Sequence, residues 1–321
     1  MLKAIISDHT FPSIDPQKSV LEPEGIELIE IQPGCVTEEE VLERCDGADV
    51  LLVQWAPITR RVLRSIPRLR GVVRYGIGVN NIDLDGAKEL GIGVANVPTY
   101  CIEEVSNHAM AMILTLARRI PHDHINIAGG GWGVSPFLPI PAFTDLTLGL
   151  VGFGSIARRV AQKAKCFGFN IATYDPYVSE SLIAENGAVR TELEPLFRSA
   201  DIISLHCPLS KETTHLVNSA TIEIMKPGVL IVNTSRGSVI HEGDLIEALR
   251  NNKIAGAGLD VFELEPLPSD SALRTLPNVV LTSHAASVST RAVQMLQIKA
   301  AESARDFLQG KRPEGALVWP V

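Results

Sequence analysis

Residues 148–175 contain the pattern that most constrains the fold of this chain. An apolar run at 148–151 is followed by a glycine turn at 152–154, an amphipathic stretch to Phe167 and a second apolar run that ends at Asp175. A strand, a glycine turn, a helix, a strand and an acidic residue in this order are typical of a dinucleotide-binding βαβ unit. This segment, called the fingerprint below, therefore predicts a parallel sheet that binds a dinucleotide.

The residues of the turn suit a pyrophosphate. Gly152 permits the tight turn, Gly154 lets a phosphate approach the backbone, and Ala157 lets the helix pack closely on the strand. The first N–H groups of the helix then point at the phosphates. Asp175, 21 residues after Gly154, is placed to accept the ribose hydroxyls of NAD and to repel the additional phosphate of NADP. A glycine turn that binds nothing is the competing interpretation, and the complete pattern favours NAD.

Strands and helices alternate on both sides of the fingerprint, which is typical of parallel sheets covered by helices on both faces. The other apolar runs that we expect to form strands lie at 4–7, 26–31, 50–54, 72–75, 93–96, 202–205, 229–232, 255–259 and 279–281. We expect the last helix, at about 288–308, to return to the first set of strands. The sequence therefore predicts an α/β fold with two doubly wound parallel-sheet domains. A Rossmann NAD-binding domain at 100–287 is inserted into a discontinuous flavodoxin-like domain at 1–99 and 288–321.

Composition excludes several classes of protein. The 321 residues suffice for two domains that each bury a core. A formal net charge of −8 argues against nucleic-acid binding, and no apolar run approaches the length of a membrane span. The first residues already form a strand-like run, so we expect no signal peptide. Without C-x-x-C pairs or metal-ligand histidine spacing, we expect buried free thiols, no metal ion and a cytoplasmic location.

A helix is expected at 103–120, and within it Val105–Ala117 is apolar on nearly every side. A surface helix has one apolar stripe, so a second face of this helix must also be covered. Burial between the two domains and burial in a subunit interface both remain open. On this pattern we predict a homodimer.

Charged side chains follow three strands after the fingerprint, where open parallel sheets bind their ligands. They are Arg236, Glu265 (with Glu263 beside it) and His284. Reduction of a 2-keto acid by hydride transfer needs such groups. Arg236 would hold the carboxylate and polarise the ketone, and His284 would protonate the developing alkoxide. Glu265, hydrogen-bonded to the other ring nitrogen, would orient the imidazole and favour its protonated form.

Each of these residues also has a structural interpretation. Arg236 could form a surface ion pair, Glu263 and Glu265 could lie in a solvated turn, and His284 could be a satisfied histidine at a domain boundary. Their positions at successive strand ends beside a dinucleotide fingerprint favour a catalytic site. His108 lies inside the apolar helix and is a weaker candidate, as are the histidines on expected loops and helix starts.

Together, five segments resemble the D-isomer-specific 2-hydroxyacid dehydrogenase family. They are the fingerprint, residues 74–83 (RYGIGVNNID), 232–237 (VNTSRG) and 259–266 (LDVFELEP), and His284. The resemblance extends from Ala4 to the C-terminal helix. It implies an NAD-dependent oxidoreductase that interconverts a D-2-hydroxy acid and its 2-keto acid, with the discontinuous domain binding the substrate.

The resemblance also implies roles for individual residues. The family's catalytic arginine, glutamate and histidine fall on Arg236, Glu265 and His284. The residues expected to contact the cofactor are Gly152, Gly154, Ser155, Ile156, Asp175, Cys207, Thr234 and Asp260.

For the substrate, the loop Gly76-Ile77-Gly78 resembles the family's carboxylate-binding loop, in which exposed N–H groups form a nest for an anion. A plain turn is the competing interpretation. Arg74 lies beside this loop, and Gln54 and Trp55 follow another strand. These three side chains could contact a phosphate or a second carboxylate, or they could be structural.

Within the family, the chain is nearest to the phosphoglycerate dehydrogenase and C-terminal-binding-protein branches, so phosphoglycerate, glyoxylate and hydroxypyruvate types of substrate are considered. Two residues depart from the pattern: Ser283 replaces the usual proline before the histidine, and Ser287 replaces the aromatic residue of the corepressor branch.

Two alternative functions remain. An NADH-responsive corepressor-like binding protein has no need of a proton donor, and formate dehydrogenases pair their histidine with glutamine, whereas this chain has Glu265.

Overall fold

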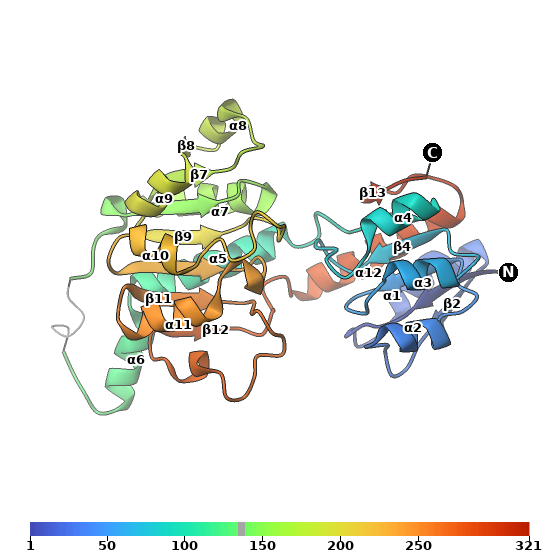
Figure 1. Cartoon of the computed structure of the whole chain (residues 1–321), viewed down its shortest axis with the longest axis horizontal. Helices are drawn as coiled ribbons and strands as arrows, with labels where there is room; N and C mark the ends of the chain where they lie inside the picture. The colour runs from blue at the N-terminus through green and yellow to red at the C-terminus, as the bar shows by residue number, and fades with distance from the viewer. Residues whose placement is uncertain (134–138, 321) are drawn as a thin grey trace. The chain divides into compact units, whose positions relative to one another are not determined.

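The computed structural model describes residues 1–133 and 139–320. The chain forms two compact units, which are described separately. Unit 1 comprises Met1–Cys101 and Val288–Val321, and unit 2 comprises Ile102–Ser287 (Figure 1). The domain boundaries expected from the sequence, at 99/100 and 287/288, lie at or within two residues of these divisions.

Unit 1 is built on a six-stranded sheet in the order β2-β1-β3-β4-β5-β13. The first five strands are parallel and follow the 2-1-3-4-5 order of flavodoxin-like folds. Its strands are β1 (Leu2–Ile6), β2 (Ile26–Glu30), β3 (Val50–Val53), β4 (Gly71–Arg74), β5 (Gly93–Ala95) and β13 (Ala316–Val318). The sequence did not indicate β13, which pairs antiparallel with β5, so the sheet has one strand that departs from the expected parallel arrangement.

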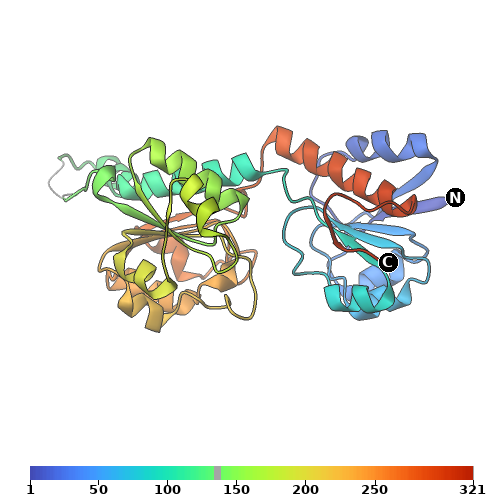
Figure 2. The ribbon, with the colours of Figure 1, turned by 90° about the horizontal axis from the view of Figure 1, so that it is seen from above.

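Helices cover both faces of the unit 1 sheet (Figure 2). They are α1 (Asp15–Leu21), α2 (Glu38–Arg44), α3 (Arg60–Ser65), α4 (Leu84–Leu90) and α12 (Thr290–Leu308). Gly71 and Gly93 show why the last helix returns to these strands. A Cβ at Gly71 would lie 2.5 Å from the Phe307 ring, and one at Gly93 would lie 2.2 Å from it. The two glycines at the starts of β4 and β5 therefore make room for an aromatic ring of α12.

Unit 2 contains a seven-stranded sheet in the order β8-β7-β6-β9-β10-β11-β12, with every pair parallel. Counted within the unit, this is the 3-2-1-4-5-6 order of the Rossmann fold with a seventh strand added. Its strands are β6 (Thr147–Val151), β7 (Asn170–Tyr174), β8 (Val189–Arg190), β9 (Ile202–Leu205), β10 (Val229–Asn233), β11 (Ile254–Leu259) and β12 (Val279–Leu281). The predicted fold class is confirmed.

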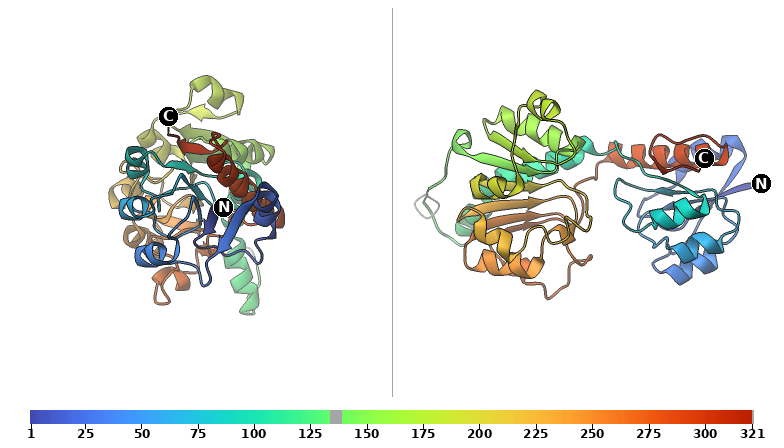
Figure 3. Two further views of the ribbon diagram at one scale, coloured as in Figure 1. Left: turned by 90° about the vertical axis from the view of Figure 1, so that its right-hand side faces the viewer. Right: turned by 45° about the horizontal axis from the view of Figure 1, so that its top comes forward.

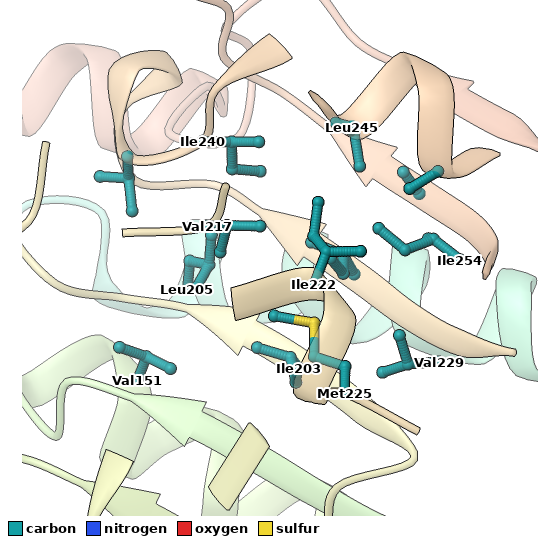
Figure 4. Close-up of a cluster of buried hydrophobic side chains, with 14 of the residues drawn as sticks. Val151, Ile203, Leu205, Val217, Ile222, Met225, Val229, Ile240, Leu245 and Ile254 are labelled. Atoms are coloured by element: carbon teal, nitrogen blue, oxygen red, sulfur yellow. The ribbon is translucent and has the colours of Figure 1, made fainter. Parts of the chain in front are cut away.

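Helices cover both faces of the unit 2 sheet (Figure 3), and a cluster of buried side chains fills the space on each side. One cluster packs α5 and α7 on one face, and the other packs α9, α10 and α11 on the opposite face. Figure 4 shows part of the second cluster, with Ile222 of α10 and Leu245 of α11 among its residues. The helices of this unit are α5 (Ile102–Ala117), α6 (Ile120–Ala128), α7 (Ser155–Cys166), α8 (Glu180–Glu185), α9 (Leu193–Ser199), α10 (Ser219–Ile224) and α11 (Glu242–Arg250).

The apolar helix α5 is explained by unit 2 itself. It packs against α7 and against β10 and β11, and a Cβ at Gly258 would lie 3.0 Å from Cβ of Met112. Residues on several sides of α5, including Val105 and Met110, are buried. The argument for a homodimer from an uncovered second face of this helix is therefore wrong. The next helix, α6, has the exposed apolar side chains instead: Ile120, Ile125 and Ile127 are 54%, 52% and 44% exposed.

Two further expectations concerned the cysteines and membrane-spanning segments. Four cysteines are buried, but Cys166 is exposed, contrary to the expectation for all five thiols. Among the described residues, no helix combines the length and the apolar character needed to cross a membrane.

Candidate active site

The fingerprint lies where the strand order of unit 2 reverses, between β6 and β9. Gly152 has a left-handed backbone (φ +89°), and a Cβ there would lie 2.9 Å from the backbone nitrogen of Cys207. The turn is therefore pressed against the loop after β9, and only glycine fits. A Cβ at Gly154 would meet nothing within 4 Å. The face of the turn at the N-terminus of α7, where Ser155 and Ile156 begin the helix, thus has room for a pyrophosphate.

Asp175 directly follows β7 and stabilises this turn. Its Oδ2 accepts a hydrogen bond from Phe153 N at 2.7 Å, and its Oδ1 accepts from Tyr177 N at 2.8 Å and Val178 N at 3.2 Å. A carboxylate has about four acceptor sites, so capacity remains for a ribose hydroxyl. The sequence interpretation did not foresee this second task of Asp175, and it also overlooked Arg158. The Arg158 guanidinium donates to Phe153 O and to Ser155 Oγ, both at 3.2 Å, and places a cation at the turn.

Two further residues expected at the cofactor have environments that suit it. Cys207 is buried, and burial raises the pKa of its thiol to about 11, so the group is neutral at physiological pH. Thr234 follows β10, and its Oγ1 is buried without a hydrogen-bond partner within the described part of the chain. A buried polar atom of this kind is normally satisfied, and a polar group of a bound ligand would satisfy it. The residues of this edge therefore fit a dinucleotide.

Glu265 and His284 are in direct contact. Nδ1 of His284 lies 2.7 Å from Oε2 of Glu265, and Oε1 of Glu265 accepts from Phe262 N at 3.0 Å. Burial by itself would raise the pKa of Glu265. The hydrogen bond and charge of His284, the Phe262 N–H and the positive charge of Arg236 outweigh burial and lower this pKa below its ordinary value. Glu265 is thus ionised, and its carboxylate lies directly beside Nδ1 of His284.

Arg236 and the loop of Glu265 are held together through Gly237. A Cβ at Gly237 would lie 1.8 Å from the carbonyl carbon of Phe262 and 2.5 Å from Glu263 N. The backbone after Arg236 therefore lies flush against the segment that carries Glu265. The Arg236 guanidinium donates to the Ser235 carbonyl at 2.6 Å.

Further charged side chains surround the Glu265 loop, and sequence reasoning missed Glu242 among them. Glu242 Oε1 accepts from Glu263 N at 2.5 Å, and the Glu263 carboxylate pairs with Nε2 of His215 at 2.6 Å. Burial, followed by the charges of Glu263 and Glu265, raises the pKa of Glu242. Glu242 is the first residue of α11, where the helix dipole favours a carboxylate, and this position was its only signal in the sequence.

Asp260 is more deeply buried than a residue that contacts a cofactor needs to be. It is 1% exposed, and its carboxylate accepts from Thr282 Oγ1 at 2.5 Å, Ala285 N at 2.8 Å and Ala286 N at 3.0 Å. The structure thus connects Asp260 to the turn that carries His284. Its contact with the cofactor stays a prediction.

In unit 1, the expected substrate residues lie at the carboxyl ends of β3 and β4. The Arg74 guanidinium lies 5.3 Å from the centre of the Trp55 ring, and Arg74 is 8% exposed. Gln54 Oε1 accepts from Thr10 N at 2.9 Å. This edge is where a flavodoxin-like sheet binds its ligand.

The anion loop follows β4. Gly76 has a left-handed φ of +137°, and its carbonyl accepts from Val97 N at 3.0 Å. The Ile77 carbonyl accepts from Asn96 Nδ2 at 2.6 Å, which fixes the loop before Gly78.

The structure brings Arg236, Glu265 and His284 to one edge of unit 2, together with the fingerprint. Arg74 and Gly76 to Gly78 form the corresponding edge of unit 1. Within residues 1–133 and 139–320, no group of three or more His, Cys, Asp or Glu side chains is arranged to hold a metal ion.

Comparison with known proteins shows what this architecture is. Residues 110–286 match the model of the D-isomer specific 2-hydroxyacid dehydrogenase, NAD binding domain. The chain belongs to the D-isomer-specific 2-hydroxyacid dehydrogenase family. Unit 2 therefore contains the family's NAD-binding domain.

Three similar proteins illustrate the range of the family. D-3-phosphoglycerate dehydrogenase of Methanocaldococcus jannaschii is 36% identical over 100% of this chain and 60% of its own length. A glyoxylate reductase of Korarchaeum cryptofilum is 37% identical over 86% of this chain and 85% of its own. The crystal structure of D-lactate dehydrogenase from Aquifex aeolicus complexed with NAD and lactic acid has a TM-score of 0.87 at 29% identity, covering 99% of this chain and 100% of that one. The chain thus spans about 60% of the length of the phosphoglycerate dehydrogenase.

Proposed function

We propose that this protein is an NAD-dependent dehydrogenase that interconverts a D-2-hydroxy acid and its 2-keto acid. The observation that carries the proposal is the 2.7 Å contact between Glu265 and His284 at the ligand-binding edge of an NAD-binding domain. A carboxylate on Nδ1 orients the imidazole so that Nε2 can exchange a proton with substrate. The pairing with glutamate rather than glutamine favours this activity over a formate dehydrogenase.

The chemistry divides among the residues of unit 2. Bound NADH would supply the hydride, held by Gly152, Gly154, Ser155, Ile156, Asp175, Cys207, Thr234 and Asp260. Arg236 would bind the substrate carboxylate and stabilise the negative charge that develops on the ketone oxygen. His284 would donate its proton to that oxygen, and in the reverse direction it would take the proton from the hydroxyl. Ionised Glu265 would keep His284 oriented and charged during reduction.

The edge of unit 1 also has groups that suit an anionic substrate. The loop Gly76-Ile77-Gly78 would hold a carboxylate through its N–H groups. Arg74, kept in place by the Trp55 ring, is a fixed cation at the same edge. This combination supports a small 2-keto acid of the phosphohydroxypyruvate, hydroxypyruvate or glyoxylate type.

A substrate panel tests the function. NADH oxidation would be measured with glyoxylate, hydroxypyruvate, pyruvate, phenylpyruvate and 3-phosphohydroxypyruvate. His284→Ala and Arg236→Ala should each lower turnover at least about a hundredfold, the scale of a lost general acid or charge stabiliser, while NADH binding is retained. NADH binding without turnover of any 2-keto acid by the wild type would overturn the proposal in favour of an NADH-responsive binding protein.

Glu265→Gln gives an independent test through pH. The proposal assigns Glu265 a negative charge beside the proton donor, and Glu265→Gln would keep a hydrogen-bonding group at His284 Nδ1 without that charge. The neutral amide lacks this charge, so the pH profile of ketone reduction should move to lower pH. An unshifted profile would mean that Glu265 does not tune His284.

We further propose a homodimer and a cytoplasmic location. The support for a dimer is the exposed apolar pair Ile120 and Ile127 on α6, which lie seven residues apart and therefore on one side of the helix, where a second copy would cover them. Free thiols are typical of a reducing compartment and support the cytoplasm.

A further inference from the structure

His108 lies on α5, and the sequence interpretation set it aside as part of an apolar helix. The structure places its ring at the turn that carries His284. Nε2 of His108 lies 3.0 Å from Oγ1 of Thr282, although the two residues are 174 positions apart in the chain. The packing of α5 against β10 and β11 brings the ring to this place.

The direction of each hydrogen bond follows from the neighbours. Thr282 has one hydroxyl hydrogen, and it donates this hydrogen to Oδ1 of Asp260 at 2.5 Å. Thr282 Oγ1 can therefore only accept from His108, so Nε2 of His108 carries a hydrogen and donates it. The three side chains form a directed series, from His108 through Thr282 to Asp260, which we call the relay.

The relay ends on the backbone of the catalytic turn. Asp260 accepts from the N–H groups of Ala285 and Ala286 through its two carboxylate oxygens, and its carbonyl accepts from His284 N at 2.8 Å. Asp260 thus binds three consecutive N–H groups, from His284 to Ala286.

His284 needs this support because its backbone is strained. Its φ is +54°, in the left-handed region that residues other than glycine rarely adopt. The preceding residue is Ser283, so no proline ring restricts the approach to the turn. The hydrogen bonds that Asp260 accepts from this turn therefore hold the conformation in which His284 reaches Glu265.

We propose that His108 is a positioning residue for the reaction. By donating to Thr282, it orients the hydroxyl toward Asp260, and the oriented carboxylate holds His284 in its left-handed conformation. This inference rests on the proposed function in so far as His284 is the proton donor. The geometry of the relay itself can be tested without turnover.

The test compares variants that delete each hydrogen bond with variants that retain it. His108→Leu removes the donor, whereas His108→Gln places an amide N–H near the position of Nε2. Thr282→Val removes the hydroxyl at constant shape, whereas Thr282→Ser retains it. Thr115→Val is the matched control, because it removes a hydroxyl from α5 about 10 Å along the helix from His108.

We expect His108→Leu and Thr282→Val each to lower kcat for 2-keto acid reduction about tenfold, the scale of one lost hydrogen bond. His108→Gln, Thr282→Ser and Thr115→Val should stay within about threefold of wild type. The double variant His108→Leu/Thr282→Val should also lose about tenfold, not a hundredfold, because both changes break the same series. The Kd for NADH should change less than kcat in all variants, because the fingerprint is untouched even where Asp260 is displaced.

Amide hydrogen exchange separates failure of the relay from failure of the proposed function. Faster exchange at Ala285 and Ala286 in His108→Leu and Thr282→Val, but not in Thr115→Val, supports the relay even if no 2-keto acid is turned over. Unchanged exchange at both amides would overturn it, as would a hundredfold loss in the double variant. If His108→Leu does not fold, Thr282→Val and His108→Gln decide: normal kcat and exchange in Thr282→Val refute the relay.

Discussion

Gly237→Ala is the substitution whose effect the structure determines most directly. A Cβ at this position would lie 1.8 Å from the carbonyl carbon of Phe262. Real Cβ atoms essentially never lie within 3.0 Å of a non-bonded heavy atom. The backbone at Phe262 must therefore move by about 1.2 Å. Phe262 N is hydrogen-bonded to Glu265, which lies three residues further on in the same loop, so the displacement is passed to the carboxylate.

The size of the effect follows from the Glu265–His284 contact. At 2.7 Å this contact is short, and a shift of about 1.2 Å would take it beyond hydrogen-bond distance. A hydrogen bond to a charged group contributes about 1.5–3 kcal/mol, which corresponds to about a 10- to 100-fold loss of kcat. The NADH fingerprint is remote in sequence and keeps its own contacts, so we expect the Kd for NADH to be nearly unchanged.

Gly243→Ala on α11 is the matched control. Its Cβ would have its nearest contact at 3.4 Å, to the His241 ring, which is ordinary van der Waals distance. Alanine in a helix is favoured over glycine by up to about 1 kcal/mol, so this variant should be active and slightly more stable. Steady-state kcat, NADH binding and thermal unfolding would be measured for both variants. Normal kcat in Gly237→Ala would refute the argument that the two loops must lie flush for catalysis.

Three further outcomes are expected. Asp175→Ala should narrow the preference for NADH over NADPH, measured as the ratio of kcat/KM; equal efficiency of both cofactors in the wild type would contradict the role of this carboxylate. Burial lowers the pKa of His206 to about 4, below its ordinary value near 6.5. The stability from its neutral form is therefore complete above pH 6.5 and is lost as pH falls toward 4, by about 3 kcal/mol. His206→Gln should flatten this part of the pH dependence of chemical denaturation, and identical curves would rule it out. Ile127→Asp on α6 should convert a dimer into monomers in light scattering, and a monomeric wild type would exclude the dimer itself.

Much of the fold follows from local pattern. The apolar runs, the glycine turn and the acid at Asp175 are short-range features, and the parallel strands that they indicate are present in both sheets. The same holds for the positions of Arg236, Glu265 and His284, because a residue that follows a parallel strand is placed at the ligand-binding edge by topology alone. The antiparallel strand β13 and the short β8 were missed, since two or three residues carry too little periodicity to be recognised.

The tertiary structure alone decided which groups meet across long stretches of chain. Nothing in the sequence indicates that Gly237 must accommodate the backbone of Phe262, or that the apolar faces of α5 are covered by α7 and the sheet. His108 looked like a core residue because its neighbours in the helix are apolar, and only the packing of α5 on the sheet places its ring against Thr282. Sequence patterns report the environment that a residue shares with its neighbours in the chain, whereas a hydrogen bond between residues 108 and 282 depends on how whole elements pack.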